Sequence, residues 1–302
     1  MFLSIKSIAK VDTANLYLDS ISVIAGYNGS GKTTISKCLY GMLEIASDAS
    51  FTESKAKKSF SSLFSSQIAT FGYDDLASIK LQENDDFLIS FVPSCEESFS
   101  FSKSRKCKIP DVVYLRSPSR WSDSFSDKLR SQLERPVVNI DANQTQVVDI
   151  LNKAASGFMD SDGDNYLYRD EDFPRYGVSI DNTASGLMIF LELSRLIGNG
   201  TIKANSVLII DEPDSNLHPS KQVMLAKALV EISEKMQIKM LLTSHNIYFI
   251  RALEVSLLES TLKDFRFYTM KQDAKTKLYS SFDATENTDV IYSELYKPLE
   301  DL

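Results

Sequence analysis

Residues 26–33 read Gly-Tyr-Asn-Gly-Ser-Gly-Lys-Thr, and they indicate the architecture of the whole chain. The stretch has the form G-x-x-x-x-G-K-S/T, in which glycines let backbone N–H groups approach a phosphate closely. The mostly apolar stretch Ile21–Ala25 before it predicts a strand. The residues from Thr34 to Leu43 predict a helix, because apolar side chains recur on one face. A strand, a glycine-rich loop and a helix in this order predict a nucleotide phosphate site at the positive end of the helix.

The loop supplies most of the predicted nucleotide contacts. Lys32 can reach the β- and γ-phosphates, and the hydroxyl of Thr33 can ligate Mg²⁺, so ATP and Mg²⁺ are the predicted cofactors. Lys10 and Tyr17 are candidates for contacts to adenine. The predicted phosphate-binding residues of this loop are Asn28, Gly29, Ser30, Gly31, Lys32, Thr33 and Thr34.

A second site element follows the apolar run Val207–Ile210, which has the length and composition of a buried parallel strand. Asp211 and Glu212 come directly after it, so the strand would hold both carboxylates rigidly at the carboxyl edge of the sheet. Neighbouring residues on a strand point to opposite faces and can divide two roles between them. We expect Asp211 to hold Mg²⁺ and Glu212 to orient the attacking water. The long separation from Lys32 leaves room for an inserted subdomain.

Three further stretches carry a family resemblance. Residues 181–187 read Asp-Asn-Thr-Ala-Ser-Gly-Leu, 211–219 read Asp-Glu-Pro-Asp-Ser-Asn-Leu-His-Pro, and 242–246 read Leu-Thr-Ser-His-Asn. Together with the glycine-rich loop they resemble the ABC-type ATPases, in particular their soluble branch. That branch includes chromosome-maintenance and double-strand-break-repair ATPases, OLD nucleases, and the small ATPase subunits of bacterial anti-phage systems such as Septu-type or retron-associated modules. The resemblance covers roughly residues 1–45 and 176–302.

The resemblance implies roles for further residues. Ser185 and Gly186 match the signature motif, which contacts the γ-phosphate of ATP held by the other subunit, so a homodimer around ATP is implied. Residues 215–217 match the D-loop at the dimer interface, and His245 matches the switch histidine that senses the γ-phosphate. The implied catalytic residues are Glu212, His245 and Lys32. A Ser-Gly pair before a helix is also an ordinary helix N-cap, and that alternative stays open.

The sequence departs from the transporter members of this family in three places. Its signature lacks the second glycine and the following Gln or Glu, and His218 stands where transporters have Asp. No Q-loop glutamine is evident either. By position its equivalent is Arg116-Ser117-Pro118, directly after the predicted strand Val112–Leu115.

The predicted fold class is α/β, a P-loop NTPase of the ABC-ATPase head type, with a mixed parallel core sheet, an antiparallel β lobe and a helical insert. Residues 1–302 are predicted to form one domain, with 1–50 and 186–302 as the nucleotide-binding core. Residues 51–185 would be inserted lobes that end in the signature. Local patterns predict strands in 1–25 that pair through a turn at Asp19-Ser20, antiparallel strands at 87–91, 99–102 and 112–115, a helix over 144–158, a loop or hairpin over 160–172, and a helix over 186–197.

Composition limits the compartment and partners. The chain has 302 residues and a net charge of −8, which argues against general adhesion to DNA, although nucleic acid stays open as a partner. Its three cysteines form no C-x-x-C pair, which indicates a reducing cytoplasm. No apolar stretch approaches the ~20 residues needed to cross a bilayer, so no membrane contact is expected.

These features predict an ATP-hydrolysing switch that dimerises around ATP and controls a separate effector. The effector would be a nuclease or another toxin in a bacterial defence or DNA-processing complex, because 302 residues leave no space for an effector beside the ATPase core. A DNA-repair or DNA-tethering ATPase is the alternative. A transporter ATP-binding subunit is disfavoured by the altered signature and the missing glutamine.

Overall fold

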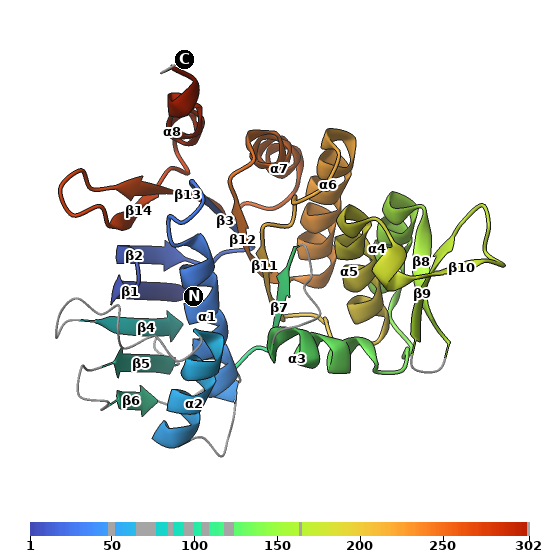
Figure 1. Ribbon diagram of the computed structural model, residues 1–302, viewed down its shortest axis with the longest axis horizontal. Coiled ribbons are helices and arrows are strands. Elements are labelled where there is room, and N and C mark those ends of the chain that lie inside the picture. The colour runs from blue at the N-terminus through green and yellow to red at the C-terminus, as the bar shows by residue number, and fades with distance from the viewer. Residues whose placement is uncertain are drawn as a thin grey trace.

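The computed structural model describes residues 1–47, 52–64, 77–83, 87–93, 99–103, 109–117, 124–162 and 165–300. Within these ranges, eleven strands form one mixed sheet in the order β6-β5-β4-β1-β2-β14-β13-β3-β12-β11-β7. A separate antiparallel sheet has the order β10-β9-β8. In Figure 1 the antiparallel end of the main sheet lies on the left, the parallel strands lie in the centre, and the small sheet lies on the far right.

The parallel part of the main sheet carries the glycine-rich loop and the acidic strand end. β3 (Ile21–Ala25) lies between β13 (Phe265–Gln272) and β12 (Lys239–Ser244), and it is parallel to both. β11 (Val207–Asp211) pairs in parallel with β12 and with β7 (Val112–Arg116). Every residue of β3 and β11 is buried, which explains why their sequences are apolar except for Ser22 and Asp211.

The remaining strands extend this sheet, and most of them run antiparallel. They are β1 (Phe2–Ile8), β2 (Val11–Tyr17), β4 (Ser78–Glu83), β5 (Phe87–Pro93) and β6 (Phe99–Lys103). β14 (Tyr279–Asp283) joins the two parts, because it is antiparallel to β13 and parallel to β2.

Helices cover both faces of the parallel strands. α1 (Lys32–Ser47) packs on one face, with α2 (Glu53–Leu63) against it. The other face is covered by α4 (Ala142–Ala155), α5 (Met188–Gly198), α6 (Pro219–Met236) and α7 (Ile247–Glu259). α3 (Ser124–Leu133) adds to this second core, and α8 (Asp289–Glu300) meets the glycine-rich loop, where the Tyr27 hydroxyl donates to the carbonyl of Glu294.

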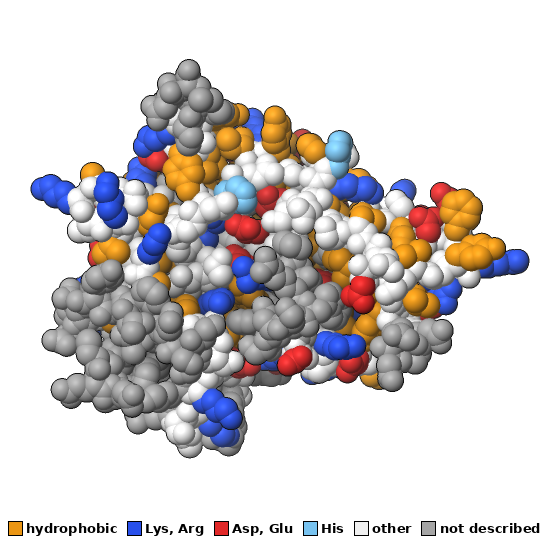
Figure 2. All heavy atoms as spheres, in the orientation of Figure 1, with side chains coloured by type: hydrophobic (Ala, Val, Ile, Leu, Met, Phe, Trp, Pro, Cys, Tyr) orange, Lys and Arg blue, Asp and Glu red, His pale blue; other side chains and the backbone are white. Residues whose placement is uncertain are grey.

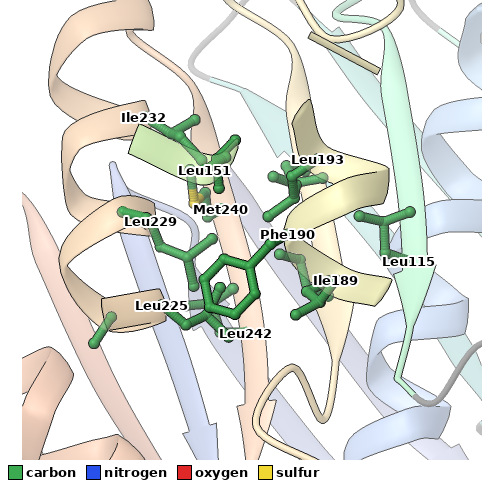
Figure 3. Packing of buried hydrophobic residues seen from close by; sticks show 14 of the residues in the cluster. Leu115, Leu151, Ile189, Phe190, Leu193, Leu225, Leu229, Ile232, Met240 and Leu242 are labelled. Carbon is green, nitrogen blue, oxygen red and sulfur yellow. The ribbon is translucent and has the colours of Figure 1, made fainter. Parts of the chain in front are cut away.

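The strands divide their side chains between two hydrophobic cores. Val207 and Ile209 of β11 belong to the core under α1, whereas Leu208 and Ile210 belong to the core under α4–α7. In Figure 3, Phe190 of α5 points between Leu225 and Leu229 of α6 and Leu242 of β12. The alternation places Asp211 on the α1 face, because residues two apart on a strand share a face.

The small sheet consists of β8 (Gly157–Asp162), β9 (Asn165–Asp170) and β10 (Gly177–Ser179). β8 and β9 pair antiparallel, which confirms the hairpin alternative over 160–172. Two 3₁₀ turns, η2 (Ile180–Asn182) and η3 (Ser185–Leu187), connect this sheet to α5. The predicted helix over 186–197 therefore begins as a 3₁₀ turn, and the one over 144–158 ends at Ala155 because Ser156 has a left-handed φ of 57°.

Two predicted strand pairings are wrong. β2 and β3 do not pair through the turn at Asp19-Ser20, because β14 and β13 lie between them in the sheet. Strand 112–115 is not antiparallel: it is β7, which runs parallel to β11 and places Val113 and Leu115 in the core under α4–α7. In both cases the partner is distant in sequence, so local patterns could not identify it. None of the helices described here is both long enough and apolar enough to cross a membrane.

Candidate nucleotide site

The glycine-rich loop has the backbone shape that a phosphate cradle needs. Gly29 and Gly31 have φ values of 76° and 94°, a region that favours glycine. A Cβ at Gly31 would lie 2.5 Å from Cγ2 of Val11, so no side chain fits there. In the part of the chain that the structure describes, the buried hydroxyl of Ser30 has no hydrogen-bond partner. These features fit an anion that enters the loop and accepts a hydrogen bond from Ser30.

The start of α1 adds positive charge to this cradle. Its first turn has no acidic residue, and the preceding Gly31 offers no capping side chain, so its positive end faces the loop. Lys32 Nζ donates to the carbonyl oxygens of Gly26 at 2.7 Å and Tyr27 at 2.9 Å. An ammonium group has three protons, so one donor remains for a phosphate oxygen. Burial lowers the pKa of Lys32, and the carboxylates of Glu212, Asp211 and Asp214 oppose that effect.

Asp211 gathers hydroxyl groups from three other elements. Thr33 Oγ1 donates to Asp211 Oδ2 at 2.8 Å, and Thr243 Oγ1 donates to Oδ1 at 2.6 Å. The Tyr114 hydroxyl lies 3.4 Å from Oδ2. A hydroxyl and a carboxylate are the hard oxygen ligands that Mg²⁺ prefers, together with phosphate oxygens and water. The pair Thr33 and Asp211 therefore fits the predicted Mg²⁺ site.

Glu212 and His245 form a second pair beside it. Glu212 has a left-handed φ of 54°, and its N–H donates to the carbonyl of Thr243 at 3.1 Å. His245 Nδ1 lies 3.3 Å from Glu212 Oε1, and both side chains are partly exposed. The hydrogen bond between them is the main cause that lowers the pKa of Glu212 and raises that of His245. This contact favours an ionised carboxylate beside a protonated imidazole. In Figure 2 one histidine, in pale blue, adjoins acidic side chains near the middle of the view.

The signature residues belong to a second group with the D-loop. A Cβ at Gly186 would lie 2.5 Å from the carbonyl oxygen of Asn216, so the two segments are in close contact. Asn216 has a left-handed φ of 62°, and both it and Ser185 are exposed. Neither η3 nor α5 has a side-chain N-cap, so the ordinary-cap interpretation of Ser185 is wrong. His218, in contrast, caps α6 by accepting from Ser220 N at 3.3 Å.

The structure also brings residues to the site that the sequence analysis did not assign. Thr243 and Tyr114 bond Asp211, and Asp214 is buried nearby with its Oδ1 unpaired among the described residues. Burial raises the pKa of Asp214 to about 6. Thr243 lies in the stretch 242–246 and could have been found from its place at a strand end. Tyr114 carries no local signal, since its role depends on the position of β7 in the sheet.

The two candidates for adenine contacts lie at opposite ends of one strand. Lys10 Nζ is 3.9 Å from the place where a Cβ at Gly29 would stand, so Lys10 borders the loop. Tyr17 ends β2, and its ring packs against Phe2 and under the guanidinium of Arg266. Lys10 therefore stays a candidate for a contact with adenine. Tyr17 is separated from the loop by the full length of β2.

Comparison with known proteins agrees with this geometry. A family model described as an AAA ATPase domain matches residues 177–250, which contain the signature, Asp211, Glu212 and His245. No curated protein gives a significant match. Three solved SMC heads resemble the chain at low sequence identity, and at such identities the likeness shows the fold.

The three similar structures cover nearly the whole chain. The SMC head domain from Thermotoga maritima has 12% identity and a TM-score of 0.53, over 93% of this chain and 97% of that one. An Smc head bound to the C-winged helix domain of ScpA has 11% identity and a TM-score of 0.60, over 96% and 98%. An Smc head with an extended coiled coil, bound to the C-terminal domain of ScpA derived from Pyrococcus furiosus, has 10% identity and a TM-score of 0.59, over 98% of each chain. The predicted fold class is confirmed: the chain has an α/β fold like that of the SMC heads, with a mixed main sheet and a small antiparallel sheet.

Proposed function

We propose that this chain binds ATP with Mg²⁺, hydrolyses it, and dimerises around it. One observation carries the proposal: the Thr33–Asp211 contact of 2.8 Å and the Glu212–His245 contact of 3.3 Å lie at the same sheet edge, beside the positive end of α1. This is the arrangement that phosphoryl transfer to water needs, because its catalysis rests on positioning and charge.

Each residue has a distinct task in the proposed reaction. Lys32 and the loop amides bind the β- and γ-phosphates, and Mg²⁺ held by Thr33 and Asp211 would neutralise phosphate charge. Glu212 accepts a hydrogen bond from the attacking water, and His245 keeps that carboxylate ionised and oriented. The water oxygen bonds to the γ-phosphorus, the bond from phosphorus to the ADP oxygen breaks, and the water proton passes to Glu212.

Dimerisation would use the second group of residues. Ser185 is exposed at the start of the 3₁₀ turn η3, directly before α5, and neither element has a side-chain cap. The hydroxyl of Ser185 and the N–H groups of this turn are suited to bind the γ-phosphate held by another subunit. The exposed Asn216 lies against Gly186 and would meet the partner at the same interface. A ligand shared by two subunits binds the dimer better than the monomer, so its hydrolysis separates them.

The test uses the variant Glu212→Gln, which keeps the size of the side chain and removes its charge. With ATP and Mg²⁺ this variant is expected to elute as a dimer in size-exclusion chromatography with light scattering, and without ATP as a monomer. Lys32→Ala is the matched control and is expected to bind no ATP. A Glu212→Gln protein that stays monomeric at saturating ATP contradicts the dimer model, and tight ATP binding by Lys32→Ala contradicts the site.

A separate protein partner is part of the proposal, namely an effector such as a nuclease or another toxin in a bacterial defence or DNA-processing complex. The segment between β9 and β10 supports a protein partner, because its Phe173 and Tyr176 are 65% and 76% exposed. Figure 2 shows hydrophobic side chains, in orange, at the right-hand end, where Figure 1 places β8–β10. Purification of the tagged chain from its native cells should recover an effector, and the double variant Phe173→Ser with Tyr176→Ser should lose it.

A DNA-tethering ATPase is the second candidate, and a cluster of lysines favours it. Lys55 and Lys58 of α2 and Lys128 of α3 line a surface hollow, although Glu44 forms an ion pair with Lys128. Fluorescence anisotropy with labelled double-stranded DNA and the ATP-bound Glu212→Gln protein tests this function. Binding that weakens steeply with salt and is lost in Lys55→Glu with Lys58→Glu would support it, and unchanged anisotropy would reject it.

A further inference from the structure

β7 brings an arginine to the edge of the nucleotide site, at the place where the resemblance leads one to expect a glutamine. Arg116 is the last residue of β7 and is in register with Asp211 of the neighbouring parallel strand. Ser117 N donates to the carbonyl oxygen of Asp211 at 3.0 Å, which fixes the end of β7 beside the acidic strand end. Figure 1 shows β7 beside β11 at this edge of the parallel strands.

Strand geometry sets the face on which Arg116 lies. Residues in register on adjacent parallel strands stand on the same face, so Arg116 shares a face with Asp211. Tyr114, two residues earlier, confirms that this face is the one that carries α1. Its ring packs 5.5 Å from that of Tyr40 in α1, and its hydroxyl lies 3.4 Å from Asp211. The exposed side chain of Arg116 thus lies on the side of the sheet that holds Thr33 and the phosphate loop.

A guanidinium group at this position binds a different kind of ligand from the glutamine that it replaces. A carboxamide can ligate Mg²⁺ through oxygen, but a guanidinium has only N–H donors and always carries a positive charge, so it binds anions. Arg116 is in register with Asp211, which accepts a hydrogen bond from Thr33 in the first turn of α1, so the guanidinium extends from a backbone position next to the phosphate site. The anion that ATP adds here and ADP lacks is the γ-phosphate.

We propose that Arg116 contacts the γ-phosphate of the ATP bound by its own subunit and makes the site prefer ATP over ADP. The inference rests on the proposed function and deepens it by assigning the residue that distinguishes substrate from product. Arg116 takes part in no bond change. Its paired N–H groups donate to the γ-phosphate oxygens and neutralise part of their charge. This contact is lost when phosphate leaves the site.

Isothermal titration calorimetry with Mg²⁺ measures this preference directly. The ligands are ADP and adenylyl imidodiphosphate, an ATP analogue that resists hydrolysis. The protein concentration is kept low enough that light scattering shows a monomer with either ligand bound. In Arg116→Gln the Kd for the analogue is expected to rise roughly 10- to 100-fold, since one charge-assisted contact is lost, while the Kd for ADP changes less than about twofold. Arg116→Lys keeps the positive charge but loses the paired N–H donors of the guanidinium, so its Kd for the analogue is expected to lie between those of the unmodified protein and Arg116→Gln.

The control variant is Arg175→Gln, which removes an exposed arginine from the loop between β9 and β10 and should leave both Kd values unchanged. If both variants bind the analogue and ADP more weakly by the same factor, Arg116 has a structural role. If both variants bind the two nucleotides as tightly as the unmodified protein, Arg116 has no role in binding. Either result overturns the inference. Circular dichroism melting shows that the variants are folded. The proposed function fails in a different way, because then the unmodified protein itself binds neither nucleotide.

Discussion

The buried carboxylate of Asp214 destabilises the folded state, so a substitution that removes its charge is expected to stabilise the protein. The residue is 4% exposed, and its Oδ1 has no partner among the described residues. Burial raises its pKa from 3.8 to about 6, although a hydrogen bond from Ser244 opposes that shift. The variant Asp214→Asn keeps the shape and an acceptor oxygen for Ser244 while it removes the buried charge.

The size of the effect follows from proton linkage. The folded state binds the proton of Asp214 more tightly than the unfolded state, so stability falls as the pH rises from about 4 to about 6 and stays lower above that range. A shift of this size costs about 3 kcal/mol at pH 8, at 1.36 kcal/mol for each pKa unit. We therefore expect the free energy of unfolding of Asp214→Asn to exceed that of the parent protein by roughly 2–3 kcal/mol at pH 8 and by about 1 kcal/mol at pH 4.5.

Urea and thermal unfolding followed by circular dichroism measure the difference. For a chain of this length, 3 kcal/mol corresponds to a rise in melting temperature of about 5 °C. Asp149→Asn is the control, because it makes the same change of charge at an exposed position of α4. A destabilising charge on Asp214 is excluded if Asp214→Asn is no more stable than the parent protein at pH 8, or if the difference in stability does not shrink as the pH falls below 6.

Two further substitutions test the contacts around the site. In Gly186→Ala the new Cβ would lie 2.5 Å from the Asn216 carbonyl, so ATP binding measured by calorimetry should persist while ATP-dependent dimerisation measured by light scattering is lost; dimers at unchanged yield would contradict this role. Thr243→Val removes the hydroxyl that donates to Asp211 and should cost about 1–3 kcal/mol in urea unfolding. Thr243→Ser is its control and should restore most of that loss; equal stability of all three proteins would contradict the assigned hydrogen bond.

The site residues that the sequence identifies are those with local signals. The stretch 26–33 sits between an apolar strand and an amphipathic helix, and Asp211 and Glu212 end an apolar run. The structure places Asp211, Glu212 and His245 at one sheet edge, as their positions at strand ends predict, and Thr33 of α1 meets Asp211 there. The carboxyl ends of parallel strands share one edge of the sheet, and Glu212 meets His245 there because β11 lies next to β12.

Other features depended on which strands became neighbours. The sequence contains no local sign that β13 and β14 separate β2 from β3, or that β7 joins the parallel strands. The apolar residues of β7 suit an antiparallel or a parallel partner equally well, because strand propensity reflects packing more than backbone preference. The contact of Tyr114 with Asp211 follows from that pairing and could not be read beforehand. For Arg116, the family resemblance indicated the Q-loop position, and the pairing supplied the register with Asp211.

The glycine-rich loop and the acidic strand end could be predicted as site elements from the amino-acid sequence, because their chemistry lies in residues a few positions apart. The signature segment was predicted from the family resemblance. Tertiary structure alone decided that Asp214 is buried, that Asn216 closes on Gly186, and that Arg116 lies in register with Asp211. Burial and strand pairing come from contacts between segments far apart in the chain, whose free energy is gained only when the whole core assembles.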